Sequence, residues 1–260
     1  MEQSGSQSMH PSFLNVIAQR ERIKKKLSGI KHKIGVYSAK GGVGKTTVAV
    51  NLAYALNGLG YKVGLLDADI DCPNVNFFTG MEASVMQTAV EPMLHKGVKV
   101  LSTALFTDDA KRPIIWRGPL IAKMVAEFLE NADWGALDYL IVDLPPGTSD
   151  APLSIMQLLD LDGIVLVTTP QKIAAINASR SGLMAKRLGV AILGIVETMS
   201  LGNPANATEI SKSLGAKFLG SIKFDVRFNK LSDEGKIPVL EEKEISEEFM
   251  NIIKNLDIKR

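Results

Sequence analysis

A glycine-rich segment near the start of the chain reads Lys40-Gly41-Gly42-Val43-Gly44-Lys45-Thr46-Thr47. An apolar, β-favouring run at 34–38 precedes it, and an apolar pattern of helical period at 45–58 follows it. A strand, a glycine loop and a helix in this order predict that backbone N–H groups surround phosphate oxygens at the start of the helix. The segment therefore predicts a phosphate-binding loop.

Two side chains of this loop have the chemistry to bind a nucleotide and its metal ion. Lys45 is long enough to reach β- and γ-phosphates, and the hydroxyl of Thr46 is a ligand for Mg²⁺. The strict form of the pattern has glycine at position 39, where this chain has Ala39, and a second lysine, Lys40, opens the loop. We therefore expect ATP and Mg²⁺ as cofactors and Lys45 as a catalytic residue.

Length and composition fit one large α/β domain. The chain has 260 residues, of which 46% are hydrophobic and 22% charged, and this is enough for a substantial core. A net charge of +2 is too small to indicate a nucleic-acid partner. One cysteine excludes a disulfide within the chain. No apolar run has the length of a membrane span and no signal-peptide pattern is visible, so we expect a cytoplasmic protein.

Strand and helix patterns alternate from residue 34 onward. Alternation of this kind predicts an α/β fold, with a single doubly wound, mostly parallel sheet and helices on both faces. We assign 1–29 to a flexible, basic N-terminal segment and 30–260 to the nucleotide-binding domain. Strands are expected at 34–38, 62–66, 98–102, 138–142, 163–168, 191–196 and near 217–222. Helices are expected at 13–28, 45–58, 118–131, 151–159, 172–187, 206–214, 227–233 and 245–257.

Acidic residues fall where two of these strands end, which is where ligands bind in open parallel sheets. Asp143 follows the apolar run Leu140-Ile141-Val142, and a carboxylate there can hold Mg²⁺ opposite the Thr46 hydroxyl. Asp67 and Asp69 follow the second strand. We expect Asp67 in the second shell of Mg²⁺ and Asp69 to orient the attacking water, and a solvated acidic turn is the alternative.

The loop after Asp143 reads Leu144-Pro145-Pro146-Gly147-Thr148. Two prolines stiffen the turn, and a glycine leaves a backbone N–H accessible to a γ-phosphate. This predicts a nucleotide sensor at Gly147 that orders with a triphosphate and relaxes after hydrolysis.

Several further runs resemble one family of ATPases. They are Asp67-Ala68-Asp69-Ile70-Asp71-Cys72-Pro73-Asn74, Trp116-Arg117-Gly118-Pro119, Asp143-Leu144-Pro145-Pro146-Gly147-Thr148, Thr168-Thr169-Pro170-Gln171 and Asp233-Glu234-Gly235-Lys236. In order and spacing they resemble the Mrp/ApbC group, which belongs with MinD, ParA and the nitrogenase iron protein to the deviant Walker A class. The resemblance implies a homodimeric ATPase that carries iron–sulfur clusters to client apoproteins. It also implies that Lys40 touches the partner's nucleotide.

This chain departs from the group's pattern at the cluster site and the base site. The group has Glu-Asn-Met-Ser after the sixth strand and then a Cys-x-x-Cys pair, whereas this chain has Glu197-Thr198-Met199-Ser200 and no following cysteine. Thr198 stands where the group has an adenine-contacting asparagine, and the group's Ile-Pro-x-Asp run near the base is Ile222-Lys223-Phe224-Asp225 here. The usual iron–sulfur site therefore cannot form. Cys72 is either an ordinary packing cysteine or a speculative ligand of a cluster shared by two chains.

A second function is compatible with the same nucleotide site. A ParA/MinD-like positioning ATPase would act on DNA or a partner protein without a cluster. The basic residues before position 30 have no groove-reading motif, which argues against nucleic acid. The C-terminal helix has an apolar face but an acidic polar side, so we expect it to dock on the sheet and not on a membrane. The three histidines show no ligand or triad spacing and are expected at the surface.

Overall fold

Continuous apolar runs form the central strands. Every residue of β2 (Val63–Asp67) and of β6 (Gly163–Thr168) is buried, as expected for strands of a parallel sheet with both faces covered. The computed structural model describes residues 11–70, 72–82, 91–102, 104, 118–148 and 150–256. Within these residues the strands form one sheet, and both layers of helices that the sequence predicts are present.

The sheet has the strand order β3-β4-β2-β5-β1-β6-β7-β8 across the described residues. Short β3 pairs antiparallel with β4, and the other neighbours pair in parallel. The predicted mostly parallel sheet is therefore confirmed. The bounds of the remaining strands are β1 Ile30–Tyr37, β3 Met93–His95, β4 Val98–Leu101, β5 Leu137–Asp143, β7 Ile192–Ser200 and β8 Phe218–Lys223.

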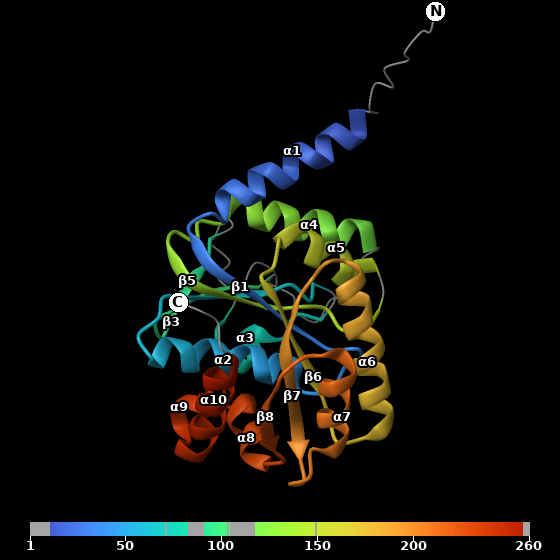
Figure 1. Cartoon of the computed structure of the whole chain (residues 1–260). Helices are drawn as coiled ribbons and strands as arrows, with labels where there is room; N and C mark the ends of the chain where they lie inside the picture. The colour runs from blue at the N-terminus through green and yellow to red at the C-terminus, as the bar shows by residue number, and fades with distance from the viewer. Residues whose placement is uncertain are drawn as a thin grey trace, which may run out of the picture.

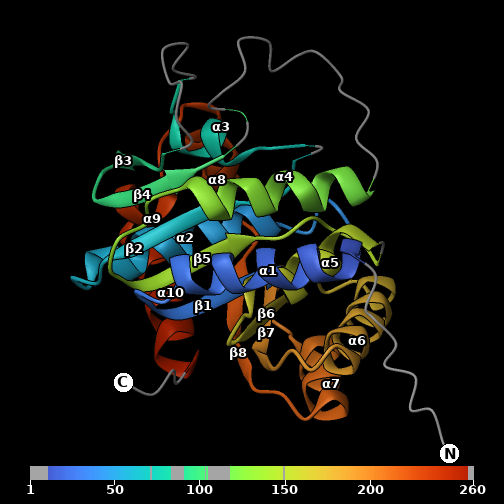
Figure 2. The same ribbon diagram turned by 90° about the horizontal axis from the view of Figure 1, so that it is seen from above.

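Helices cover the two faces of the sheet in separate layers (Figures 1 and 2). One apolar core lies under α1 (Pro11–Lys26), α4 (Gly118–Asn131), α5 (Asp150–Leu159), α6 (Lys172–Arg187) and α7 (Ala205–Leu214). The other lies under α2 (Lys45–Gly58), α3 (Val75–Thr79), α8 (Val226–Asp233), α9 (Pro238–Glu241) and α10 (Lys243–Leu256). Because α2 follows β1 through the glycine loop, its N-terminus lies at the edge where the parallel strands end.

The C-terminal helix docks on the sheet as its pattern predicts. Ile245, Phe249, Ile252 and Leu256 recur at intervals of three and four residues and are all buried. Burial of each such side chain contributes about 1.5–3 kcal/mol to the free energy of unfolding, so this face of α10 forms part of the core. None of the described helices combines the length and the apolar character that crossing a bilayer requires.

Helix α1 precedes the predicted domain boundary and packs against the body. Ile23 and Leu27 are buried in the core beside α4 and α5. At its surface Arg22 and Gln19 both bind the carboxylate of Glu130 on α4. The segment before residue 30 therefore contains a docked helix over 11–26, while residues 1–10 lie outside the described part. The domain boundary itself stays a prediction.

Several elements differ from the sequence-based expectation. The first strand begins at Ile30 instead of residue 34, because Ile30 pairs with Leu137 at the start of β5. Strand β3 and helices α3 and α9 were not predicted, since three to five residues carry too little periodicity to indicate an element. The predicted helix 245–257 is α10, although residue 257 lies outside the described part.

Candidate nucleotide-binding site

The glycine loop connects β1 to α2 and has the backbone that phosphate binding needs. Gly42 and Gly44 adopt φ of 77° and 82°, a left-handed conformation that other residues avoid. No side chain caps the N-terminus of α2, and a Cβ atom at Gly41 or Gly42 would meet nothing within 4 Å. Uncapped N–H groups beside open space at a helix N-terminus fit an anionic phosphate.

Lys45, Thr46 and Asp143 meet directly beneath this loop. The Lys45 Nζ lies 2.6 Å from one carboxylate oxygen of Asp143, and the Thr46 hydroxyl donates to the other at 2.6 Å. Lys45 is 7% exposed and Asp143 1% exposed, so each buried charge depends on the other for compensation. Lys45, predicted to contact phosphate, therefore lies in one cluster with Thr46 and Asp143, which were predicted to bind Mg²⁺. An ammonium group, a hydroxyl and a carboxylate are the groups that a phosphate and Mg²⁺ require.

Asp67 lies buried at the end of β2 and organises the loop that follows. Its carboxylate accepts hydrogen bonds from the backbone N–H groups of Asp69, Asn74 and Val75, each at 3.1 Å, and from the Ser102 hydroxyl at 3.0 Å. These bonds hold the backbone of Asp69, Asn74 and Val75 around the Asp67 carboxylate. A magnesium second-shell role for Asp67 stays a prediction beside this structural one.

The electrostatic surroundings of Asp67 favour its protonated form. Burial is the main cause that raises the pKa of Asp67, to about 7, and the negative charge of Asp143 adds to it. The Val75 N–H and the positive charge of Lys45 oppose this shift. When Asp67 is ionised, two buried carboxylates lie near one lysine, and a divalent cation would relieve the resulting excess of negative charge.

Asp69 lies at the rim of the same cluster. One of its carboxylate oxygens is 4.0 Å from the Lys45 Nζ, and the other accepts the Cys72 backbone N–H at 3.4 Å. Across the described residues, no three His, Cys, Asp or Glu side chains are grouped to hold a metal ion.

Cys72 is exposed, so its interpretation as a buried packing residue is wrong. It follows the acidic turn, where backbone N–H groups point inward to the carboxylates of Asp67 and Asp69. Its side chain is consequently left at the surface. Asp71, which precedes it, lies outside the described residues.

The predicted sensor loop is attached to the end of β1. The Gly147 N–H donates to the Ser38 carbonyl at 3.0 Å, and the Gly147 carbonyl accepts the Tyr37 hydroxyl at 2.5 Å. Gly147 has φ of 94°, a conformation that requires glycine. Its N–H group is therefore engaged here, and a contact with a γ-phosphate requires this bond to open. Tyr37 was not predicted from the sequence. It could have been found as a hydroxyl-bearing residue in the apolar strand before the phosphate loop.

Thr198 packs against the phosphate loop. Its hydroxyl lies 2.6 Å from the Val43 carbonyl and 3.0 Å from the Thr168 carbonyl, and the residue is 4% exposed. A hydroxyl has one proton to donate, so these two carbonyls share it. The side chain thus ties the end of β7 to the loop, and a contact with the nucleotide base stays a prediction.

A hollow of about 450 Å³ lies beside the loop. Residues 40–43 form one wall, and the other wall includes Met199, Leu201 and Phe224. Leu201 is 83% exposed and Phe224 62% exposed, which is unusual for large apolar side chains in a cluster. The exposed Lys40 lies on the same rim. The hollow therefore offers an apolar surface next to a phosphate site.

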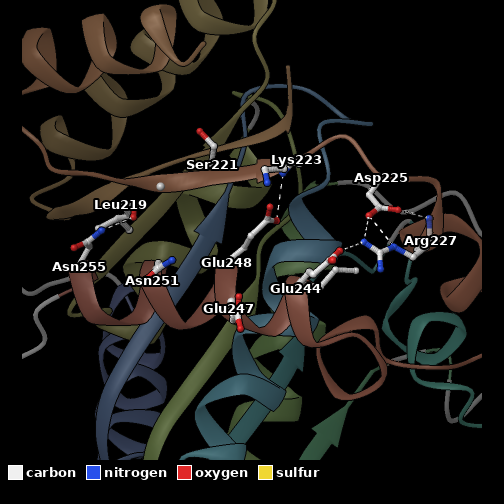
Figure 3. Close-up of a pocket in the computed structure, with 12 residues that line it drawn as sticks. Leu219, Ser221, Lys223, Asp225, Arg227, Glu244, Glu247, Glu248, Asn251 and Asn255 are labelled. Atoms are coloured by element: carbon white, nitrogen blue, oxygen red, sulfur yellow. Dashed lines mark hydrogen bonds and ion pairs between the residues drawn. The ribbon is translucent and has the colours of Figure 1, made fainter. Parts of the chain in front are cut away.

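Asp225 has a structural role in this conformation. It is the N-cap of α8, where it accepts the Arg227 N–H at 2.8 Å and pairs with the Arg227 guanidinium at 2.7 Å. Figure 3 shows these contacts at one end of a second hollow, of about 550 Å³, between β8 and α10. Arg227 also pairs with Glu242 and Glu244. The bonds from Arg227 lower the pKa of Asp225, and the predicted base contact stays a prediction.

The second hollow is the seam where α10 covers the last strand of the sheet. Glu248 accepts the Lys223 N–H at 3.3 Å, and Asn255 donates to the Leu219 carbonyl at 2.9 Å (Figure 3). Side chains of α10 therefore satisfy backbone groups on the outer edge of β8, which protects that edge from pairing with other chains. This arrangement accounts for the hollow as part of the fold.

The histidines are less exposed than expected. His95 is half-buried, and its Nδ1 lies 2.6 Å from the Tyr54 hydroxyl. His32 is also half-buried and stacks on Tyr139 with 5.2 Å between ring centres. His10 lies outside the described residues. Aromatic neighbours, Tyr54 on α2 and Tyr139 on β5, explain both positions, and sequence spacing does not reveal them.

A glycine loop at an uncapped helix, with a buried lysine, threonine and aspartate beneath it, defines a P-loop nucleotide-binding protein. Residues 29–257 match the sequence model of the family described as ParA, NUBPL iron-transfer P-loop NTPase. The chain belongs to this family.

Relatives of known name agree with this assignment. An iron–sulfur cluster carrier protein of Methanocaldococcus jannaschii is 40% identical over 96% of this chain and 93% of its own length. One from Aquifex aeolicus is 38% identical over 90% of this chain and 69% of its own length. A nucleotide-binding protein of Archaeoglobus fulgidus, solved in complex with ADP, has a TM-score of 0.74 and 36% identity over 89% of this chain and 95% of its own.

The fold also resembles that of a cell-division ATPase. MinD of Pyrococcus furiosus has a TM-score of 0.69 and 21% identity, over 87% of this chain and 98% of its own. At this identity the likeness shows the fold alone.

Proposed function

We propose that the chain is a Mg²⁺-dependent ATPase that works as a homodimer in iron–sulfur cluster delivery, with its ATP state controlling the form of the dimer and the handling of cargo or client. The observation that carries this proposal is the contact of Lys45 and Thr46 with Asp143 beneath the uncapped N-terminus of α2. Iron–sulfur carrier relatives at about 40% identity support the cellular role. The ADP complex of the Archaeoglobus relative supports the choice of nucleotide.

Each residue of the cluster has a role in phosphoryl transfer. The phosphates would be surrounded by the backbone of the glycine loop and the first turn of α2, which comprise Gly41, Gly42, Val43, Gly44 and Thr47. Lys45 would leave Asp143 and contact the β- and γ-phosphates. Thr46 and Asp143 would hold Mg²⁺, which would neutralise phosphate charge when bound. Asp69, at the rim, orients the attacking water. Positioning and charge neutralisation carry most of the catalysis, so no strong base is needed.

Dimer formation would complete the site. Lys40 is exposed on the rim of the hollow and next to exposed Met199, Leu201 and Phe224. Covering such a rim with a second copy buries apolar surface and brings Lys40 to the partner's nucleotide. Gly147 then reports the γ-phosphate through its N–H group.

A cluster cargo would be held differently from the group's usual pattern. Four residues, Leu201–Pro204, join β7 to α7 and contain no cysteine. Exposed Cys72 supplies one thiol per chain, so a cluster across a dimer would also need other ligands. We therefore propose cluster handling together with a client or assembly partner in the cytoplasm.

Lys40 separates dimer-based hydrolysis from simple nucleotide binding. Lys40→Ala should bind ATP as a monomer with nearly the wild-type Kd, because its side chain is exposed and lies outside the Lys45–Asp143 cluster. It should lose ATP-dependent dimerisation, measured by sedimentation, together with hydrolysis. Exposed Lys26→Ala is the matched control. Normal hydrolysis by Lys40→Ala would exclude the role of this lysine across the dimer.

Anaerobic reconstitution with iron and sulfide tests the cargo. Visible absorbance that is lost in Cys72→Ser, with transfer of the cluster to an apoprotein, would support a cluster shared by two chains. No bound iron in the wild-type protein would exclude a carrier role that rests on this chain alone.

The alternative is a positioning ATPase of the ParA/MinD kind, which acts on DNA or a partner protein without a cluster. The absence of cysteine from the loop after β7 favours it. ATP-dependent dimerisation without any iron binding, together with ATP-dependent capture of DNA or a protein, would favour this function over cluster delivery.

A further inference from the structure

Tyr37 is a buried side chain that the proposed mechanism does not use. It is the last residue of β1, is fully buried, and stands three residues before Lys40. Burial raises the pKa of Tyr37, and the hydroxyl of Ser181 on α6 opposes this only in part. The phenol therefore keeps its proton at neutral pH and acts as a hydrogen-bond donor.

The Tyr37 hydroxyl and the Ser38 carbonyl hold the same residue from two sides. Tyr37 donates to the Gly147 carbonyl at 2.5 Å, and Gly147 donates its N–H to the Ser38 carbonyl at 3.0 Å. Three residues before Gly147, the Leu144 N–H donates to the Val36 carbonyl at 3.1 Å. The loop after β5 is thus fastened along the end of β1, and Gly147 is the last point of attachment.

The hydrogen bond from the Gly147 N–H to Ser38 competes with a contact between that N–H and a nucleotide. The N–H of Gly147 cannot donate fully to Ser38 and to a γ-phosphate at the same time. Gly147 has φ of 94° and a Cβ atom there would meet nothing within 4 Å, so the backbone has room to move once its bonds open. Any group that stabilises the attached form must therefore oppose the triphosphate-bound form.

We propose that Tyr37 is a positioning residue that fastens the Gly147 loop in the form bonded to Tyr37 and Ser38 and so sets the preference between ATP and ADP. The proposal rests on the proposed ATP-binding function. ADP has no γ-phosphate and does not require the loop to open, whereas ATP binding includes the cost of breaking these bonds. Tyr37 does not touch the nucleotide and acts through Gly147.

Tyr37→Phe keeps the ring and removes the hydroxyl. A single buried hydrogen bond corresponds to about a two- to ten-fold change in an equilibrium constant. We expect the Kd for a non-hydrolysable ATP analogue with Mg²⁺ to fall by about that factor while the Kd for ADP stays unchanged. Tyr54→Phe is the matched control, because Tyr54 is equally buried and its hydroxyl contacts His95 away from the loop.

Amide hydrogen exchange of the full-length protein without nucleotide tests the fastening independently. The Gly147 amide should exchange several-fold faster in Tyr37→Phe than in the wild type or in Tyr54→Phe. Unchanged exchange would overturn the fastening role. Faster exchange with an unchanged ratio of ATP-analogue to ADP affinity would overturn the link to the triphosphate.

A merely structural role would lower the melting temperature of Tyr37→Phe without changing that ratio, and this too would overturn the proposal. If the wild-type protein binds no ATP analogue, the proposed function fails, and the exchange measurement still decides whether Tyr37 fastens the loop.

Discussion

Thr198→Val tests whether the end of β7 fixes the phosphate loop. Valine has nearly the same shape as threonine but no hydroxyl, so the change removes the contacts of 2.6 Å and 3.0 Å to the carbonyls of Val43 and Thr168 and leaves the packing in place. Because Thr198 is 4% exposed, water cannot readily replace the lost donor. A buried polar group left without its partner costs about 1–3 kcal/mol.

This cost appears in two measurements. The melting temperature of Thr198→Val should fall by about 2–4 °C for each kcal/mol in a chain of this size. The Kd for ATP and for ADP should also rise. The rise is about ten-fold if the free energy of ordering the loop around phosphate increases by 1.4 kcal/mol. Val43 lies between two glycines with left-handed backbone, so a loosened Val43 carbonyl disorders the N–H groups that bind phosphate. Isothermal titration of both nucleotides measures the effect.

Thr79→Val is the matched control. Thr79 is 1% exposed, and its hydroxyl donates to the Val75 carbonyl at 2.8 Å within α3, away from the loop. It should lose similar stability without a change in nucleotide Kd, and Thr198→Ser should recover wild-type binding. Unchanged nucleotide binding in Thr198→Val, with a fall in melting temperature like that of Thr79→Val, would show that Thr198 supports the fold alone.

Two further predictions concern stability. Gly80→Ala should lower the unfolding free energy by about 1–3 kcal/mol, because a Cβ atom there, at φ of 69°, would lie 2.7 Å from the Gly235 carbonyl oxygen. The control is Gly58→Ala, in open space on α2, which should be neutral or stabilising. Equal melting temperatures for the two variants would contradict the contact between Gly80 and Gly235. Burial lowers the pKa of His95, so the unfolded chain binds its proton more tightly and the unfolding free energy should fall as pH drops below about 6.5. Urea titrations between pH 5 and 8 should show this slope in the wild type and less of it in His95→Gln, and equal slopes would refute the assignment.

Local pattern was sufficient to predict the unit of strand, glycine loop and helix and most of the fold. The loop at 40–47, the apolar strand before it and the helical period after it all lie within 25 residues, so one window contains the strand, the turn and the helix. Asp143 could be added because carboxyl ends of parallel strands share one edge. The structure places its carboxylate 2.6 Å from Lys45 and Thr46.

Contacts between distant segments could not be read from the sequence. Tyr37 meets Gly147 across 110 residues and Thr198 meets Val43 across 155, and no spacing rule connects such pairs. The same limitation explains Cys72, which seemed fit for the core by residue type, yet follows a turn whose N–H groups point inward and is exposed. Short β3 and α3 form because tertiary packing supports segments that have weak periodicity of their own.

Equilibrium binding of ATP with Mg²⁺ tests the central claim, that Lys45 and Asp143 form the base of an ATP site. The wild-type protein should bind ATP, and Lys45→Ala should lose tight binding and hydrolysis while keeping its fold, as judged by circular dichroism. Lys31→Ala is the control, because Lys31 is exposed and pairs with Asp138 at the opposite end of β5. Binding of ATP by Lys45→Ala with the wild-type Kd would contradict the account.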